Sequence, residues 1–381
     1  MLPHLYAEES DPAKMRKVSL ASIPFIRRLS PIYKGSLRES HLRKLDRVSV
    51  LLAFMLLSVI FAPQVFGHAP LMPGSNESLD TATVVSDPTK SWAVYAELHE
   101  GGEAQYYRFD IAQEQRIHVS LLKSTAPDDG DFVPGFVLMG PKLASQDTAP
   151  EYVEMPEGVG SIVVGGKNPT RATYEAFSPS AFYQLADLEL DASSSGTYYV
   201  AVYDNLRGGH YGLAIGDRES FTLSEWILTP LSVVSIREWS GQSLPVMFAP
   251  AVAVFLVGIA ILILGRRTTG SPRTSFQWTG AAAGLLFLGS SFTVVFQMLI
   301  ALTLAPFGLD VIVTIVLALV PIIMGIFAVR FALRKTVNVR TRVSTAILGV
   351  LALFAWAGFV IGPILAIIAS VLPHSKTNQT H

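Results

Sequence analysis

The chain has 381 residues, of which 50% are hydrophobic and only 15% are charged, and this composition is typical of a membrane protein. It contains no cysteine, which excludes disulfide frameworks, thiolate metal sites, iron–sulfur clusters and cysteine nucleophiles. The formal net charge of −1 conceals three regions. Residues 1–47 carry ten basic and five acidic side chains. Residues 68–243 carry ten basic and 24 acidic side chains, and residues 244–381 carry nine basic side chains and one acidic side chain.

The first region is a basic tail, residues 1–47, followed by an apolar run at 48–67. Basic residues favour the cytoplasmic side and are attracted to anionic lipid headgroups, so we predict a flexible cytoplasmic tail and no role in binding nucleic acid. The apolar run has two interpretations. With Val65 and Gly67 at the minus-three and minus-one positions, it fits a signal peptide cut before His68. Because the basic leader is long, it also fits a permanent membrane anchor.

Residues 68–221 form an acidic region with many short runs of β-branched and aromatic residues, bounded by Gly, Pro, Asp and Asn. Such runs predict strands, and many strands at close spacing predict an all-β sandwich or barrel. In one strand, Tyr107, Phe109 and Ile111 share a face, which suits one buried face. The predicted strands are Ser91–Leu98, Gln105–Ile111, Arg116–Leu122, Gly135–Met139, Glu151–Met155, Gly160–Val164, Phe182–Leu190, Gly196–Tyr203 and His210–Ile215.

Two parts of this region carry a family pattern. The opening Asn76-Glu-Ser78 with the aromatic stretch Gly102–Asp110, and the closing stretches Ser195–Tyr203 and Gly209–Ile215, resemble the pre-peptidase C-terminal domain. The pattern departs from the family at Glu103-Ala-Gln105, where the family has Asp-x-Asp. The resemblance implies an extracellular β-sandwich that serves attachment or recognition, and it implies no active site.

The segment 222–244 changes character. Thr222 or Ser224 could cap a helix that begins at Glu225. Trp226 and Trp239 close to a membrane boundary indicate an interfacial helix. A last strand or a packed linker is the alternative.

The region 245–372 contains four apolar stretches, each long enough to cross the hydrocarbon core as a helix. Together they predict a four-helix transmembrane bundle, with extracytoplasmic residues 68–244 and an extracytoplasmic tail at 373–381, because the Lys and Arg residues gather in alternate loops. The spans have no charged residue at their centres, which argues against a pump or channel. The four stretches are Val246–Leu264, Trp278–Ala305, Val311–Val329 and Val343–Leu372.

Glycine pairs at four-residue spacing occur in two of these spans. Gly280 and Gly284 lie in one, and Gly358 and Gly362 lie in another. Small residues at this spacing allow helices to approach closely. We therefore expect packing within the bundle or against a partner subunit.

A copper site is one possible metal centre. If cleavage occurs before His68, its terminal amine and imidazole would form a strong chelating pair for Cu(II). A second histidine would come from His99, His118 or His210. Nothing in the spacing selects one of them, and a histidine at such a position is more often a surface or packed strand residue than a ligand.

A calcium site is the other possibility. Asp128, Asp129 and Asp131 provide hard oxygen ligands in one loop, although the rest of an EF-hand loop is missing. A solvated acidic turn is the favoured interpretation.

The glycine-rich stretch 158–166 precedes a strand rather than a helix, so it predicts a β-turn and not a phosphate-binding loop.

The sequence contains no G-x-S-x-G, H-E-x-x-H or P-loop motif, so no enzyme is expected, and a hydrolase would require residues assembled only in space. The leading hypothesis is a non-catalytic, multi-pass membrane protein whose β-sandwich binds an envelope component, an extracellular component or a partner protein. The expected partners are the lipid bilayer and a membrane or envelope protein, with no required cofactor. The alternative is an extracytoplasmic copper-binding protein with His68 as terminal ligand.

Overall fold

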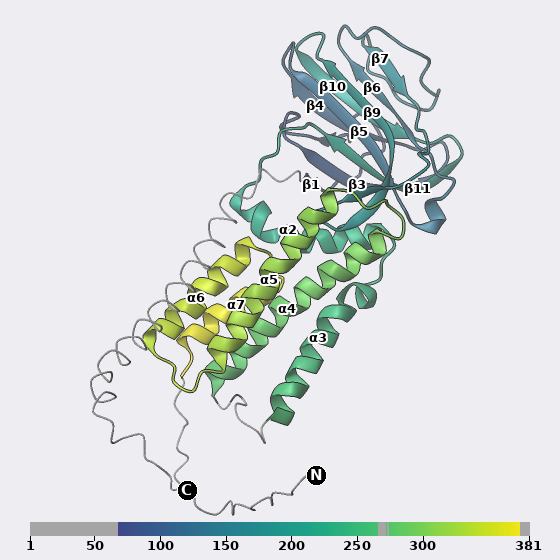
Figure 1. The fold of residues 1–381 in the computed structure, drawn as a ribbon. Helices are drawn as coiled ribbons and strands as arrows, with labels where there is room; N and C mark the ends of the chain where they lie inside the picture. Colours follow the sequence, from purple (N-terminus) through teal and green to yellow (C-terminus); the bar gives the residue numbers. More distant parts are fainter. Residues whose placement is uncertain (1–67, 266–271, 273, 374–381) are drawn as a thin grey trace, which may run out of the picture. The chain divides into compact units, whose positions relative to one another are not determined.

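The computed structural model describes residues 68–265, 272 and 274–373, all within one compact unit that begins at Ala62. The predicted tail at 1–47 and the anchor or signal peptide at 48–67 lie outside the described residues, as do 374–381. The description below therefore concerns the β region and the helices that follow it (Figure 1).

The β region consists of two mixed sheets (Figure 1). Two pairs, β1 with β3 and β2 with β4, are parallel, and the others are antiparallel. The six-stranded sheet has the order β1 (Ala69–Leu71), β3 (Trp92–Glu100), β11 (Arg207–Ile215), β5 (Arg116–Ser124), β9 (Ser180–Asp191) and β8 (Thr173–Glu175). The five-stranded sheet has the order β2 (Thr83–Val84), β4 (Ala104–Ile111), β10 (Gly196–Tyr203), β6 (Gly135–Gly140) and β7 (Gly160–Val164).

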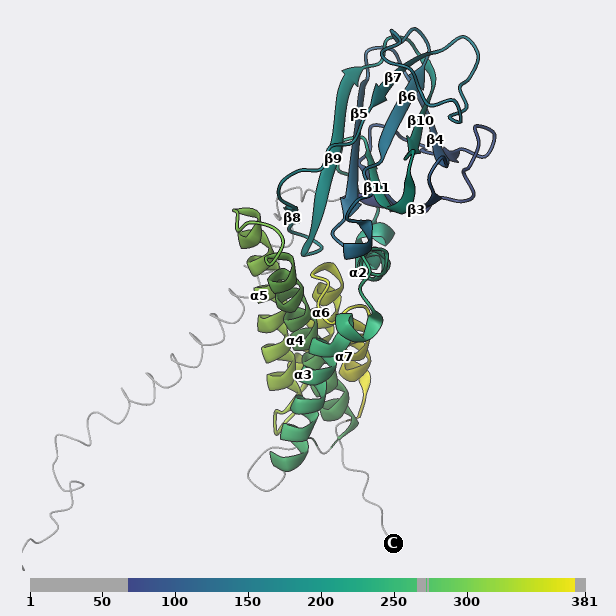
Figure 2. The ribbon, with the colours of Figure 1, turned by 90° about the vertical axis from the view of Figure 1, so that its right-hand side faces the viewer.

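The two sheets share one hydrophobic core. Val94 and Leu213 of the first sheet and Phe109 and Val200 of the second are all buried in the same cluster. Period-two alternation places such residues on one face of each strand. Figure 2 shows the two sheets in a view turned by 90°. Two sheets with a common core are consistent with the predicted sandwich.

Strand β10 is covered on both faces, because its alternate residues enter two clusters. Tyr198 and Val200 belong to the shared core. Ala201 and Tyr203 belong to a second cluster with Tyr106 of β4. This second cluster lies under loops, and it explains why β10 has aromatic residues on both faces rather than a polar outer face.

Most of the predicted strands are confirmed. Two of them, Gly160–Val164 and Gly196–Tyr203, match β7 and β10 residue for residue. The predicted strand Glu151–Met155 is wrong, because this segment forms turns. Sequence alternation missed β1, β2 and β8, since strands of two or three residues are too short to show a period.

The described helices are α2 (Leu223–Trp239), α3 (Leu244–Leu264), α4 (Ser275–Ala301), α5 (Asp310–Ala332), α6 (Val339–Phe354) and α7 (Ile361–Val371), with a short 3₁₀ turn, η3 (Pro127–Asp129), in the β region. Thr222 caps α2 through a capping box with Glu225. The helix predicted for 222–244 is therefore confirmed, and the alternative of a last strand is wrong.

Helices α3, α4 and α5 are long and apolar enough to cross a membrane. They pack through glycine, as the four-residue spacing predicts. A Cβ added to Gly284 would lie 2.9 Å from the Gly325 carbonyl oxygen, and one added to Gly280 would lie 3.1 Å from Ala332 Cβ. Because no side chain intervenes, the backbones of α4 and α5 approach closely.

The fourth predicted span, Val343–Leu372, is wrong as a single helix. The chain leaves α6 after Phe354, turns through six residues and returns as α7. In this turn Trp356 and Gly358 have positive φ angles of 51° and 73°, which an α-helix does not accommodate. The Gly358–Gly362 pair is therefore not a helical stripe, because Gly358 lies in the turn.

Helices α6 and α7 form an antiparallel hairpin. Arg342, in the first turn of α6, donates from Nη1 to the carbonyl oxygens of Ser370 and Leu372 at 2.9 and 2.7 Å. A Cβ on Gly349 would lie 3.1 Å from Ala366 Cβ. The end of α7 thus lies beside the start of α6. The side of a membrane on which Pro373 lies stays a prediction.

A disulfide across α4 and α7 tests this hairpin. A Cβ on Gly280 lies 3.8 Å from Ala369 Cβ, close to the mean Cβ separation in disulfides of about 3.8 Å. We expect Gly280→Cys with Ala369→Cys to cross-link on oxidation, as measured by peptide mass spectrometry. The chain has no other cysteine.

The control pair, Gly280→Cys with Ala357→Cys, joins α4 to the turn of the hairpin and should not cross-link. In one continuous helix from Val343, Ala369 would lie roughly 40 Å along the axis. Failure of the first pair to cross-link in folded protein would contradict the hairpin.

Candidate functional site

Helix α2 is bonded to the β region at both of its ends. At its start, Glu225 accepts a hydrogen bond from the Lys90 ammonium at 2.8 Å. At its end, Trp239 donates from Nε1 to the Ala96 carbonyl oxygen at 2.9 Å and packs edge-on against Tyr95. These contacts fix the helix along one edge of the six-stranded sheet.

The same helix is bonded to the hairpin turn by a reciprocal pair of tryptophans. Trp226 Nε1 donates to the Phe354 carbonyl oxygen at 3.0 Å, and Trp356 Nε1 donates to the Trp226 carbonyl oxygen at 2.8 Å. The turn is held further by Ser290 of α4, whose Oγ accepts from the Gly358 N–H at 2.7 Å. Helix α2 therefore connects the sheets to the helical part.

A direct contact joins β8 to α5. Thr314 Oγ1 donates to the Ala176 carbonyl oxygen at 2.7 Å and lies 2.7 Å from the hydroxyl of Tyr174. Around this pair, Ala172, Ala301 and Val311 form a small buried cluster. The β8 edge thus has its own apolar and polar contact with the helices.

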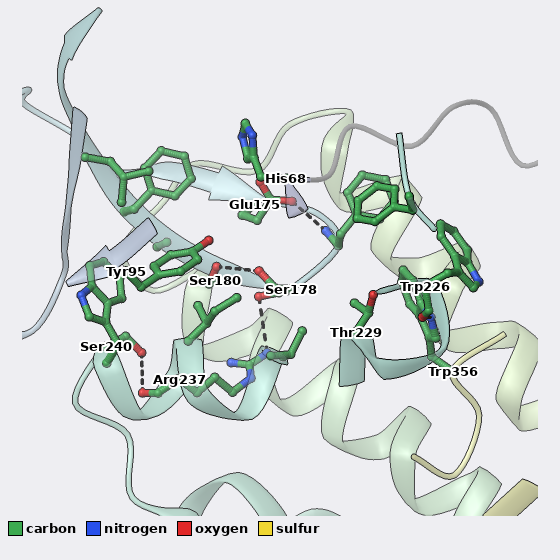
Figure 3. A pocket seen from close by; sticks show the side chains of 18 residues that line it. His68, Tyr95, Glu175, Ser178, Ser180, Trp226, Thr229, Arg237, Ser240 and Trp356 are labelled. Carbon is green, nitrogen blue, oxygen red and sulfur yellow. Dashed lines mark hydrogen bonds between the residues drawn. The ribbon is translucent and has the colours of Figure 1, made fainter. Parts of the chain in front are cut away.

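Between these contacts lies a cavity of about 120 Å³ (Figure 3). Its wall combines the strand edges, α2 and the hairpin turn. Its aromatic residues are Tyr95, Phe177, Phe182, Phe221, Trp226, Trp239 and Trp356. Its ionisable lining residues besides tyrosine are His68, Glu175 and Arg237. An apolar cavity with a few polar groups is the usual form of a ligand site, so this is the candidate site.

Arg237 of α2 is the most deeply buried of these charges, with 7% of its surface exposed. Its Nη1 donates to Gln297 Oε1 at 2.6 Å, and its Nη2 lies 3.4 Å from the Ser178 and Pro179 carbonyl oxygens. Burial lowers the pKa of Arg237 to about 10, so the guanidinium still carries its charge at neutral pH. It links α2, α4 and the loop between β8 and β9.

Glu175, at the end of β8, is the acidic residue of the cavity (Figure 3). The pKa of Glu175 is raised from 4.5 to about 7, mainly by burial. The Phe177 N–H lowers it, and the nearby carboxylates of Asp310 and Glu219 contribute to the rise. Its carboxylate accepts from the Phe177 N–H at 3.0 Å. The charge inside the cavity therefore changes close to neutral pH.

The histidines suggested for copper lie in separate environments. His68 lines the cavity, and its Nδ1 lies 2.5 Å from Ser91 Oγ. Burial lowers the pKa of His68, with a further lowering by nearby His118. His118 pairs with Asp187, whereas exposed His99 pairs with Glu103. His210 pairs with Asp129 and Glu97.

The aspartates suggested for calcium do not point to a common centre. Asp128 is exposed, and Asp131 lies 3.5 Å from Arg207. Buried Asp129 instead accepts from the His210 N–H at 3.1 Å. The described residues contain no group of three or more histidine, aspartate or glutamate side chains arranged to hold a metal ion. Copper and calcium binding stay predictions.

Lys123 occupies the inside of this acidic loop. Its buried ammonium donates to the carbonyl oxygens of Asp129, Gly130 and Phe132 at 3.1, 2.9 and 2.8 Å. Backbone carbonyls of this kind are ligands that a hard cation would use. Here a side-chain cation uses them, so the loop is stabilised from within the chain.

A second hollow, of about 370 Å³, lies beside the end of β3 and the start of β4. Its acidic lining residues are Glu77, Glu100, Glu103 and Glu154. Two of its carboxylates are already bonded inside the chain. Glu103 accepts from the His99 N–H at 2.6 Å, and Glu154 accepts from the Leu79 N–H at 2.9 Å. It is therefore a weaker candidate than the aromatic cavity.

Sequence reasoning missed Glu175 and Arg237. It singled out Trp226 and Trp239 as interfacial residues, and both line the cavity. The available signal for Arg237 was a basic residue on the apolar side of the helix predicted within 222–244. Its significance depends on burial, which the sequence does not show.

The pH dependence of stability tests the burial of Glu175. Between pH 4.5 and pH 7 the folded chain keeps a proton that the unfolded chain has released, so its stability should fall as the pH rises through this window. The loss amounts to at most about 3 kcal/mol. We expect Glu175→Gln to remove this part of the dependence in thermal unfolding measurements from pH 4.5 to pH 8.

The matched control is Glu157→Gln, which changes an exposed carboxylate and should leave the slope as in the unmodified chain. An unchanged slope in Glu175→Gln would show that Glu175 does not keep its proton in the folded state.

Lys123→Met tests the role of the buried ammonium. Removing the donor leaves three loop carbonyl oxygens without it, and hydrogen bonds from charged groups contribute about 1.5–3 kcal/mol. We expect a loss of stability of about 2 kcal/mol or more in chemical unfolding, with little effect from Lys167→Met at an exposed position. A rise in the stability of the unmodified chain on adding Ca²⁺ would instead support the calcium hypothesis.

No family model matches the chain, and no curated protein matches it. Among solved structures, the pre-peptidase C-terminal domain of a Bacillus anthracis collagenase matches with a TM-score of 0.20 and 18% identity, over 35% of this chain and 91% of that one. The Methylococcus capsulatus secreted protein MopE, described as copper-binding, matches with a TM-score of 0.12 and 11% identity, over 42% and 91%. Likenesses of this strength carry no functional argument. The chain has a weak structural neighbour in a pre-peptidase C-terminal domain.

Proposed function

We propose that the chain is a non-catalytic membrane protein that presents its β region outside the cytoplasm and binds an envelope component in the aromatic cavity. The observation that carries this proposal is the cavity itself, because its wall is shared by the strand edges, α2 and the turn between α6 and α7. If the helices lie in a membrane and the β region outside it, a cavity formed by both would be close to the membrane surface. A ligand at that surface could then enter it.

The apolar surfaces of the helices support membrane insertion. Along α3, Leu256, Ile261 and Leu264 expose 61%, 64% and 76% of their surface. Only Met247 and Ala251 of this helix are buried. Exposing such a helix to water is costly, whereas hydrocarbon is a suitable solvent for it.

The basic residues support an orientation. Arg330, Arg334, Arg340 and Arg342 lie at the end of α5 and the start of α6, and clustered Lys and Arg favour the cytoplasm. Thr314, near the start of α5, contacts the β region. The β region would therefore lie outside. Because α7 ends beside Arg342, the chain at Pro373 would lie on the cytoplasmic side, contrary to the orientation expected from sequence.

The polar groups of the cavity support binding rather than catalysis. The closest pairing of a hydroxyl with a base is Ser91 with His68, but Ser91 is only 3% exposed. Within the described part of the chain, no carboxylate is in an ion pair with His68 to orient it, as the usual triad requires. Of the three cavity serines, Ser178 and Ser180 pair with each other at 3.3 Å, and Ser240 donates to the Arg237 carbonyl oxygen at 2.8 Å.

Single cysteines test this orientation, because the natural chain has none. We expect Leu206→Cys, at a position that is 87% exposed, to react with a membrane-impermeant maleimide on intact cells. Thr336→Cys, between α5 and α6, and Pro373→Cys, after α7, should react only after permeabilisation. Labelling of Thr336→Cys on intact cells would contradict the orientation, and labelling of Pro373→Cys alone would contradict the side assigned to the end of α7.

A further inference from the structure

The Arg237 guanidinium has no acidic partner among the described residues. It has five N–H donors, yet it makes one short hydrogen bond, to Gln297, and two contacts of 3.4 Å to carbonyl oxygens. Glu175, the carboxylate of the same cavity, is not in an ion pair with it. A buried charge of this kind is strongly destabilising unless it is paired.

A second buried donor lies beside it. Gln297 is 1% exposed, and its Nε2 has no hydrogen-bond partner. The orientation of its amide is fixed, because its Oε1 accepts from both Arg237 and Gln242, the latter at 3.0 Å. The Oε1 of Gln242, in the same network, is a buried acceptor that also has no partner. The Arg237 guanidinium lines the cavity and has more donors than acceptors around it, and it therefore favours an anionic acceptor at this place.

We propose that the cavity binds a phosphate ester, with the Arg237 guanidinium as its charge partner. This inference rests on the proposed function, in that it takes the cavity to be the ligand site. A guanidinium presents two parallel N–H donors that match phosphate oxygens. The ester is carried by a membrane lipid or by a soluble metabolite, which share this chemistry.

The surroundings suit a ligand with an apolar part. Phe177, Trp226 and Trp356 line the cavity, and Leu228 and Leu231 on α2 expose 46% and 55% of their surface. A volume of about 120 Å³ accommodates a small headgroup, while acyl chains would have to lie outside along the apolar helices. Ordered water is the competing occupant, since a polar cavity of this size holds several molecules.

Intrinsic fluorescence provides the measurement, because three of the five tryptophans of the chain line the cavity. The full chain in mild detergent is titrated with dihexanoyl phosphatidic acid, with glycerol 3-phosphate, which is the head without tails, and with dihexanoylglycerol, which is the tails without the phosphate. We expect saturable binding of phosphatidic acid and at least tenfold weaker binding of dihexanoylglycerol. Glycerol 3-phosphate binding as tightly as phosphatidic acid would identify a soluble phosphate ester, and weaker binding would identify a lipid.

Variants assign the binding to Arg237. We expect Arg237→Gln to weaken phosphatidic acid binding at least tenfold and Arg237→Lys to weaken it less, because lysine keeps the charge but not the paired donors. Arg207→Gln removes an exposed arginine on β11 and should leave binding unchanged, which controls for net charge.

Val233→Trp fills the cavity while leaving Arg237 in place, and it keeps the test decisive if Arg237→Gln does not fold. It should abolish binding, whereas Ser235→Trp at an exposed position of the same helix should not. Equal binding by Arg237→Gln and the unmodified chain, equal binding of the lipid with and without phosphate, or no binding of any probe would overturn the proposal. These outcomes are independent of the labelling pattern that tests the orientation.

Discussion

The arrangement of this protein depends on the contacts of α2, which has to satisfy polar groups on two sides at once. Its start is bonded to Lys90 of the β region through Glu225, and to the hairpin turn through Trp226. Near its end, Arg237 donates to α4 and lies close to the loop before β9. Each bond buries a polar group that would be costly to leave unpaired, so α2 has little freedom to move away from either part. These hydrogen bonds fix the positions of α2, the strand edges and the hairpin turn, which together form the walls of the cavity.

The hairpin of α6 and α7 is the second constraint. A run of apolar residues that could have crossed hydrocarbon once instead turns back, because Trp356 and Gly358 adopt left-handed backbone and Ser290 accepts the N–H of Gly358. The freed carbonyl oxygen of Phe354 accepts from Trp226. Irregular backbone among apolar helices is tolerated only where protein or water satisfies it, and here α2 and α4 do so. The same turn supplies one wall of the cavity.

Several groups that resemble metal ligands in the sequence have other uses in the fold. The carbonyl oxygens of the acidic loop bind the Lys123 ammonium, and Asp129 accepts from His210. The three strand histidines pair with carboxylates, and His68 pairs with Ser91. The cavity instead contains buried Arg237 and half-buried Glu175, which are not in an ion pair with each other.

The sequence by itself determined the elements that depend on neighbours along the chain. The residue pattern of the strands located β7 and β10, and the Thr222–Glu225 spacing located the start of α2. Both signals arise between residues that are close in sequence. Hydropathy located α3, α4 and α5, but it did not distinguish a crossing from a hairpin, since the turn after Phe354 is as apolar as the helices it joins. Only the tertiary structure brought Tyr95, Glu175, Arg237 and Trp356 to one cavity. These residues lie on four elements far apart in sequence, and the burial that gives them their chemistry arises only when those elements pack.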